Sequence, residues 1–87
     1  MYEWDENNLR KLAVHRVTPE EAIEALEDDA ALDLAIQYHR RGEIRYPVLG
    51  ATKKGRLLII IWVDKSGRTR IINAFDAAPV LRRLYRN

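Results

Sequence analysis

The stretch RLLIIIWVDKSGRTRIINAF, residues 56–75, constrains the fold more than any other part of the chain. Residues 57–63 are apolar and rich in β-branched side chains, and a second β-branched run begins at residue 68. The residues between them, Asp-Lys-Ser-Gly, are typical of a tight turn, so the two runs predict an antiparallel hairpin. Because the first run is apolar on both faces, we expect it to be a central strand. Arg68 and Arg70 are expected on one face of the second strand, and Ile71 and Asn73 on the other.

A helix is predicted from Thr18 onwards. Thr18 is a favourable N-cap, Pro19 suits the first helical position, and Glu21 completes a capping box. The helix is expected to end near Asp28 or Asp29. Its apolar stripe consists of Ala22, Ile23, Ala25 and Leu26, and Val17 could pack against it from outside the cap.

A shorter helix is predicted before it, beginning after Asp5, which is its expected N-cap. The spacing of the apolar residues places Leu9, Leu12 and Ala13 on the inward side. The pattern predicts two consecutive helices ahead of the sheet.

After residue 31, apolar residues recur at every second position, as in a strand. Leu32, Leu34 and Ile36 alternate with more polar residues, which favours a strand, although the same residues could continue a helix. His39 is expected in a turn that continues through Arg41 and Gly42.

A further strand is predicted after this turn. Ile44, Tyr46 and Val48 are expected on one face, with Arg45 on the other. Pro47 cannot donate to a ladder, so it indicates an edge position or a bulge. A free edge near Pro47 would also allow a structural homodimer.

The last residues predict a closing helix with an apolar stripe on one side and arginines on the other. The stripe consists of Val80, Leu81, Leu84 and Tyr85, and the outward arginines are Arg82, Arg83 and Arg86. The order of elements predicts an α+β fold: two N-terminal helices, a small, mostly antiparallel sheet of three to four strands, and a C-terminal helix. At this length we expect a single domain over residues 1–87.

The charge is unevenly distributed along the chain. Residues 1–33 contain ten acidic and three basic side chains, whereas residues 34–87 contain twelve basic and three acidic ones, for a net charge of +2. This asymmetry favours a basic face that binds a polyanion such as nucleic acid. Solvated surface Lys and Arg residues would give the same composition.

Several protein classes are disfavoured by composition. The chain contains no cysteine, which excludes disulfides, thiolate metal sites and a cysteine nucleophile. The first residues, MYEWDENN, lack the features of a secretory signal, and the apolar runs are too short to span a bilayer. We therefore expect a cytoplasmic protein with no membrane partner.

Five segments, in order, resemble the BrnT-type toxins of bacterial toxin–antitoxin systems. They are WDENN (4–8), HRVTPEEA (15–22), RYPVLGATKKGRLLIIIWV (45–63), RTRIINAFDA (68–77) and RRLY (82–85). The resemblance implies a RelE-like fold and an endoribonuclease that cleaves cellular RNA with no metal or other cofactor. It also implies a cognate ribbon-helix-helix antitoxin, through which alone the toxin would reach operator DNA. The positions that match the family pattern are Trp4, Asp5, His15, Arg45, Gly50, Arg56, Arg70 and Tyr85.

Three positions depart from the family pattern. Arg16 stands where Gly usually follows the histidine, Phe75 stands where an Arg commonly closes the strand, and Leu81 stands where the final helix usually has a Glu. If the missing Arg and Glu contribute to cleavage, the chain would be a weaker nuclease or no nuclease at all. Phe75 and Leu81 thus favour an alternative function, a non-catalytic binding module of the same fold that partners a ribbon-helix-helix protein or RNA.

Metal-free RNA cleavage needs a group that accepts the 2′-OH proton, donors for the phosphate and an acid for the leaving oxygen. Histidine titrates near neutrality and suits proton transfer, whereas the arginine fork suits phosphate. The expected catalytic residues are therefore His15, Arg45, Arg56, Arg70 and Tyr85. Each has a structural alternative: His15 could cap a helix, the arginines could be exposed sheet residues, and Tyr85 could pack in the core.

Other basic side chains are expected to attract RNA without taking part in chemistry. They are Lys53, Lys54, Arg68 and Arg83. The two histidines lack acidic partners at ligand spacing, so no metal site is predicted.

Overall fold

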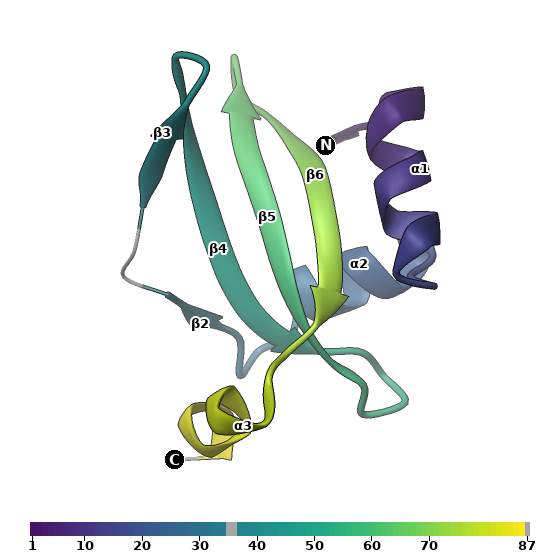
Figure 1. Cartoon of the computed structure of the whole chain (residues 1–87), viewed down its shortest axis with the longest axis vertical. Coiled ribbons are helices and arrows are strands. Elements are labelled where there is room, and N and C mark those ends of the chain that lie inside the picture. The colour runs from purple at the N-terminus through teal and green to yellow at the C-terminus, as the bar shows by residue number, and fades with distance from the viewer. Residues whose placement is uncertain (35–36, 87) are drawn as a thin grey trace.

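The predicted hairpin is the centre of the sheet in the computed structural model, which describes residues 1–34 and 37–86. It pairs β5 (Leu57–Lys65) with β6 (Arg68–Asp76) in antiparallel orientation (Figure 1). Ser66 and Gly67 have φ angles of 53° and 87°, as a two-residue turn of the primed type requires.

A β-bulge interrupts this hairpin. Ile61 pairs with Asn73 and Trp62 pairs with Ile71, so Ile72 is the extra residue. The expectation that Ile71 and Asn73 share a face is therefore wrong. The inserted residue shifts the alternation by one and places Asn73 on the face that Arg70 occupies.

Over the residues that the structure describes, the sheet has six strands in the order β1-β6-β5-β4-β2, with β3 also paired to β4. This is more than the three to four strands expected, while the α+β class is confirmed. The additional strand at the start of the chain is β1 (Tyr2–Glu3), which runs parallel to β6. The central position of β5, between β4 and β6, is confirmed.

Two short strands flank β4 (Glu43–Ala51) on its outer side. They are β2 (Leu32–Asp33) and β3 (Tyr38–Arg40). The strand predicted around Leu32 is present over these two residues, and Ile36 lies outside the described residues. His39 was expected in a turn but pairs with Ile44, whereas Arg41 and Gly42 do form a turn with positive φ.

Pro47 is not on a free edge. It pairs with Ile61 on one side, and on the other its carbonyl accepts from the Leu34 amide at 3.0 Å. Pro47 therefore lies within a paired strand, where its missing donor is tolerated.

The two N-terminal helices have the predicted caps. The Asp5 side chain accepts from the Asn8 amide at the start of α1 (Glu6–Val14). Thr18 and Glu21 form the capping box of α2 (Pro19–Leu26), which ends two residues before Asp28.

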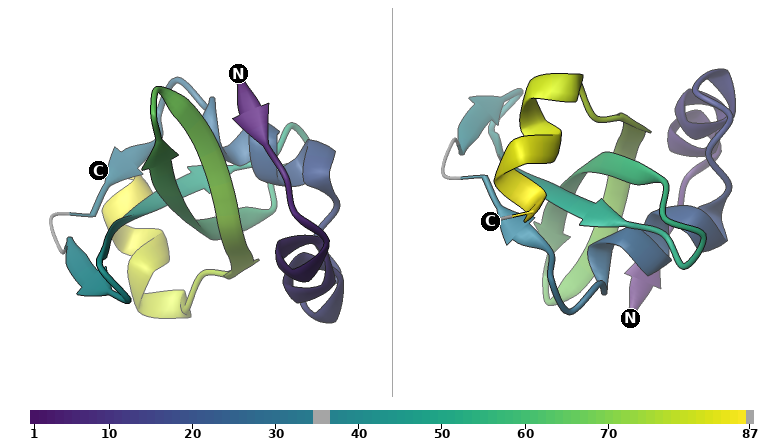
Figure 2. Two further views of the ribbon diagram at one scale, coloured as in Figure 1. Left: turned by 90° about the horizontal axis from the view of Figure 1, so that it is seen from above. Right: turned by 90° about the horizontal axis from the view of Figure 1, so that it is seen from below.

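The inward face of α1 differs from the prediction. Leu12 is buried, but Leu9 and Ala13 are exposed, and Asn8 takes an inward position instead. The reason is that α1 packs beside β6 at the border of the sheet and buries only a narrow stripe (Figure 2).

The final helix, α3 (Pro79–Arg86), is also less buried than its sequence suggests. Leu81 and Tyr85 pack against the core, but Val80 and Leu84 are 69% and 49% exposed. Figure 1 shows α3 near the end of the sheet where β6 ends, so only one side of the helix meets the sheet.

The sheet separates two clusters of apolar side chains. Leu58 and Ile60 of β5 pack with α1 and α2, whereas Ile59 and Ile61 pack on the opposite face, toward α3. Since α3 covers only part of this second face, the remainder is available for a functional site.

Candidate functional site

A concave site with cationic walls lies on the second face of the sheet, and we call it the basic groove. It encloses about 240 Å³, and none of the described residues in its lining is acidic. The lining residues are Lys11, Tyr38, Arg40, Arg41, Arg45, Ile61, Asn73 and Phe75.

The sheet register explains how these side chains converge. Tyr46 pairs with Trp62, so strand alternation places Arg45 on the opposite face, together with Ile61. Asn73 pairs with Ile61 and therefore points to this face as well. The bulge at Ile72 is what brings it there.

Both borders of the basic groove come from elements outside the central hairpin. On one side are Tyr38 and Arg40 of β3 and Arg41 of the following turn, and on the other is Lys11 of α1. Figure 1 shows β3 and α1 at opposite edges of the sheet. A ligand in the basic groove would therefore cross the strands between two cationic borders.

Arg45 is the most buried cation of the basic groove. Its side chain is 15% exposed, and its ion-pair partner Glu43 lies 3.9 Å away. The Arg45 Nε is buried and has no acceptor among the described residues. An unsatisfied buried donor costs about 1–3 kcal/mol, so an anionic ligand that accepted from this nitrogen would be stabilised.

His15 lies next to the basic groove. It is the C-cap of α1, and its exposed ring lies 5.7 Å from the ring of Phe75, with the planes inclined by 53°. Since Phe75 lines the basic groove, the His15 imidazole contacts a wall residue of the groove.

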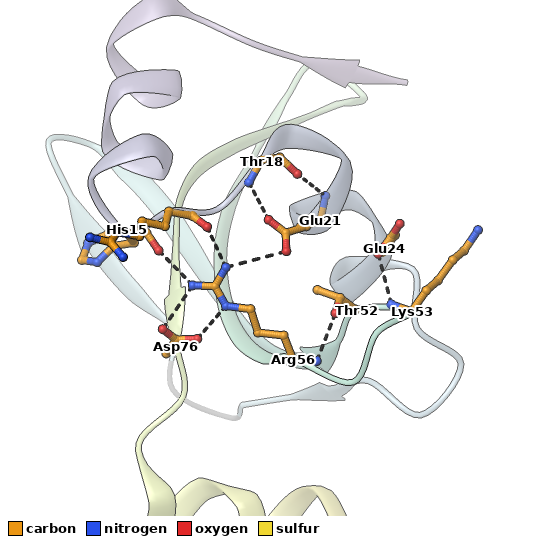
Figure 3. Close-up of polar contacts among 9 residues, drawn as sticks. His15, Thr18, Glu21, Glu24, Thr52, Lys53, Arg56 and Asp76 are labelled. Atoms are coloured by element: carbon orange, nitrogen blue, oxygen red, sulfur yellow. Dashed lines mark hydrogen bonds and ion pairs between the residues drawn. The ribbon is translucent and has the colours of Figure 1, made fainter.

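Arg56 is at the centre of a polar network that includes the main chain of His15 (Figure 3). Its Nε and Nη2 donate to the Asp76 carboxylate at 2.8 and 3.1 Å. Its Nη2 and Nη1 also donate to the carbonyls of His15 and Arg16 at 2.9 and 2.7 Å. The Glu21 carboxylate lies 3.7 Å from Nη1. The guanidinium thus joins the end of α1, the start of α2 and the end of β6.

The charges in this network stabilise each other. Hydrogen bonds from Arg56 hold the pKa of the Asp76 carboxyl below its usual range. The same bonds raise the pKa of Arg56.

Arg70 and Arg68 lie on the same face of the sheet as the basic groove but outside its lining. Arg70 donates through Nε to Glu3 at 2.8 Å, makes a second short contact with Glu3 through Nη2, and has Asp5 3.5 Å from Nη1. Arg68 is 62% exposed and lies 3.7 Å from Glu3. Both guanidinium groups are therefore close to carboxylates of the first residues.

Tyr85 connects α3 to the end of α2. Its hydroxyl donates to the Asp28 carboxylate, which also accepts from the backbone amides of Ala51 and Ala30 at 2.9 and 3.1 Å. Burial would raise the pKa of Asp28, but the hydrogen bonds from Tyr85 and the two amides outweigh it and lower that pKa.

The remaining predicted cations are exposed. Lys53 and Lys54 lie in the loop between β4 and β5, where the Lys53 backbone amide donates to Glu24 at 3.1 Å (Figure 3), and Arg83 lies on α3. The cavity beside Lys53 encloses about 550 Å³ and is acidic, with Glu20, Glu24, Glu27, Asp28 and Asp29 in its lining.

The structure therefore brings together only some of the residues singled out in the sequence. Arg45 lines the basic groove, His15 lies beside it, and Arg56 contacts the main chain of His15. Sequence reasoning missed Lys11, Tyr38, Arg40, Arg41 and Asn73. The basic pair Arg40 and Arg41 before Gly42 could have indicated a strand that folds back along Arg45. No feature of the sequence near Lys11 indicates that it lies at this site.

Two further findings concern the described residues. Within residues 1–34 and 37–86, no group of three or more His, Asp or Glu side chains is arranged to hold a metal ion. Over the same ranges, no helix has the length and apolar character needed to cross a bilayer.

Comparison with known proteins identifies the family. A search of curated proteins gave no significant match. The sequence profile of the family described as "Ribonuclease toxin, BrnT, of type II toxin-antitoxin system" matches residues 4–79, which include α1, α2 and the strands β2 to β6. The chain therefore belongs to the BrnT family, the ribonuclease toxins of type II toxin–antitoxin systems.

Proposed function

We propose that this chain is an endoribonuclease toxin that binds cellular RNA in the basic groove and cleaves it without a metal ion. The observation that carries the proposal is the arrangement of the groove. Four cations line it, one of them has a buried donor with no acceptor in the described part of the chain, and an imidazole lies beside it. Such a surface suits a phosphate backbone.

In this proposal His15 accepts the proton of the attacking 2′-OH, and the resulting imidazolium gives a proton to the leaving oxygen as its bond to phosphorus breaks, while Arg45 stabilises the charge that develops on the phosphate. Lys11, Arg40 and Arg41 hold the neighbouring phosphates. Asn73 offers an amide to the ribose or a base.

We assign structural roles to the other three expected catalytic residues. The donors of Arg56 and Arg70 are engaged with carboxylates and carbonyls, and the Tyr85 hydroxyl is engaged with Asp28. The exposed cations Lys53, Lys54, Arg68 and Arg83 would contribute only to long-range attraction of RNA.

Membership of the family implies an antitoxin partner. We propose that this antitoxin has a ribbon-helix-helix segment, that it neutralises the toxin by covering the basic groove with acidic side chains, and that it alone contacts operator DNA. The toxin would act in the cytoplasm, and its fold would be RelE-like. Because the antitoxin's acidic side chains would meet the cations of the basic groove, raising the salt concentration should slow association. An association rate that is constant from low to high salt would contradict this electrostatic account.

The test of cleavage is incubation of a mixed RNA pool with the purified chain in EDTA. The variants are His15→Ala and Arg45→Ala, and Arg10→Ala is the control because Arg10 is an exposed residue of α1 outside the basic groove. We expect cleavage by the wild type and by Arg10→Ala, and loss of cleavage in the two groove variants with their folding intact.

A second function is favoured by Phe75, which lies in the basic groove where the family pattern has an arginine. The chain would then bind RNA or its partner protein without cleaving RNA. In that case the wild type would leave the RNA pool intact, and expression of the chain alone would not arrest growth.

A further inference from the structure

We infer that Arg56 is a positioning residue, which holds the His15 ring against Phe75 at the border of the basic groove. The inference rests on the proposed function in one respect, because the proposed function gives His15 its role in catalysis. The arrangement of His15, Arg56 and Asp76 in Figure 3 is the basis for it.

The first step concerns the donors of Arg56. A guanidinium has five N–H groups, and Arg56 makes four hydrogen bonds with them. Its remaining N–H lies on Nη1, which has Glu21 3.7 Å away. A substrate phosphate would have to displace the Glu21 carboxylate or break one of the four existing bonds, so direct catalysis by Arg56 is disfavoured.

The second step concerns what these bonds fix. The two carbonyl bonds hold His15 and Arg16 at the end of α1, where the helix dipole favours a cation. The carboxylate bonds hold Asp76, the neighbour of Phe75 in β6. One guanidinium therefore fixes the backbone of His15 and the backbone next to Phe75 relative to each other, and the ring contact lies between these two points.

The third step concerns the rigidity of Arg56 itself. Its backbone amide donates to the Thr52 side chain at 3.0 Å, and its carbonyl accepts from the Thr52 amide at 2.8 Å. Thr52 is 5% exposed. The side chain thus extends from a fixed loop, as positioning to within a fraction of an ångström requires.

The experiment compares Arg56→Lys, Asp76→Asn and the matched control Arg10→Lys, each first shown to be folded by its amide spectrum. Lysine keeps the positive charge but cannot reproduce the planar set of hydrogen-bond donors of a guanidinium. The readouts are the NMR cross-peaks between the His15 and Phe75 rings, the affinity for a 2′-O-methyl RNA that cannot be cleaved through its 2′-OH, and the rate of RNA cleavage.

We expect Arg56→Lys and Asp76→Asn to lose the ring cross-peaks and to slow cleavage about 10- to 100-fold, while RNA affinity stays within about twofold because Arg56 does not touch RNA. Arg10→Lys should match the wild type in all three readouts. Ring cross-peaks that persist in both folded variants would overturn the inference, as would weakened RNA affinity with the ring contact intact. If the wild type does not cleave RNA at all, the proposed function fails, but the cross-peaks still test the positioning by Arg56.

Discussion

Gly50 of β4 and Ala25 of α2 are in backbone contact, and a Cβ on residue 50 would lie 1.9 Å from the Ala25 carbonyl oxygen. The helix could not keep its place on the sheet with any side chain there. We predict that Gly50→Ala lowers the free energy of unfolding by about 3 kcal/mol, measured by urea denaturation. Gly55→Ala is the comparison, since a Cβ there meets open space and only the φ of +88° opposes it. Equal losses for the two variants would contradict the steric explanation.

Arg16 is a site where the chain should gain stability. It has a φ of 56°, and α1 ends there with bonds from the Arg16 amide to Ala13 and from the Val17 amide to Leu12. This left-handed position favours glycine and costs other residues about 1 kcal/mol. We predict that Arg16→Gly raises the midpoint of urea denaturation, and that Arg10→Gly, within α1, lowers it by a similar amount. A destabilised Arg16→Gly protein would show that the arginine side chain has a structural role.

The two borders of the basic groove can be tested separately. Lys11→Gln and Arg40→Gln should each weaken binding to single-stranded RNA and reduce the slope of log affinity against log salt by about 0.7. The measurement is fluorescence anisotropy over a salt series. Arg10→Gln, on the same helix as Lys11, should leave the slope unchanged. If all three variants behave alike, RNA binds elsewhere.

Phe75 can be converted to the residue that the family pattern commonly has. Phe75→Arg adds a fifth cation to the basic groove and should increase RNA affinity several-fold, although it also removes the ring that His15 contacts. Phe75→Leu removes the aromatic contact with His15 without adding charge, so it should not share this increase. Cleavage by Phe75→Arg but not by the wild type would identify the chain as a binding module that retains the remaining catalytic groups.

Acid should weaken the attachment of α3. The pKa of Asp28 lies below its ordinary value of 3.8 in the folded chain, so the stability that this carboxylate contributes is complete at neutral pH. It is lost as pH falls from about 4 through the lowered folded-state pKa. We predict that the difference in unfolding free energy between wild type and Asp28→Asn shrinks between about pH 7 and about pH 3, as measured by urea denaturation. A difference that is constant with pH would mean that the charge of Asp28 does not stabilise the fold.

The parts of the fold that depend on neighbouring residues could be predicted from the sequence. The capping box at Thr18, the N-cap at Asp5 and the hairpin around Ser66 and Gly67 all follow from residues a few positions apart. The strand β1 could not be predicted in this way. It has two residues and exists because β6, more than sixty positions away, offers its edge.

The candidate site was less predictable for the same reason. Arg45 and His15 were found through their chemistry and the family pattern, but the groove depends on the bulge at Ile72, which turns Asn73 and Phe75 to the face of Arg45. The sequence indicates Arg56 as a phosphate ligand because arginine suits that role. Which carboxylates and carbonyls occupy its donors is decided by tertiary structure.

The parallel pairing of β1 with β6 also affects how the chain is made. During synthesis from the N-terminus, the strand of Tyr2 and Glu3 has no strand to pair with until Thr69 and Arg70 have been translated. The basic groove likewise combines Lys11 with Asn73 and Phe75, so a nascent chain that ends before β6 has neither a closed sheet nor a groove. The groove can therefore assemble only after β6 has been synthesised, and its function is delayed until then.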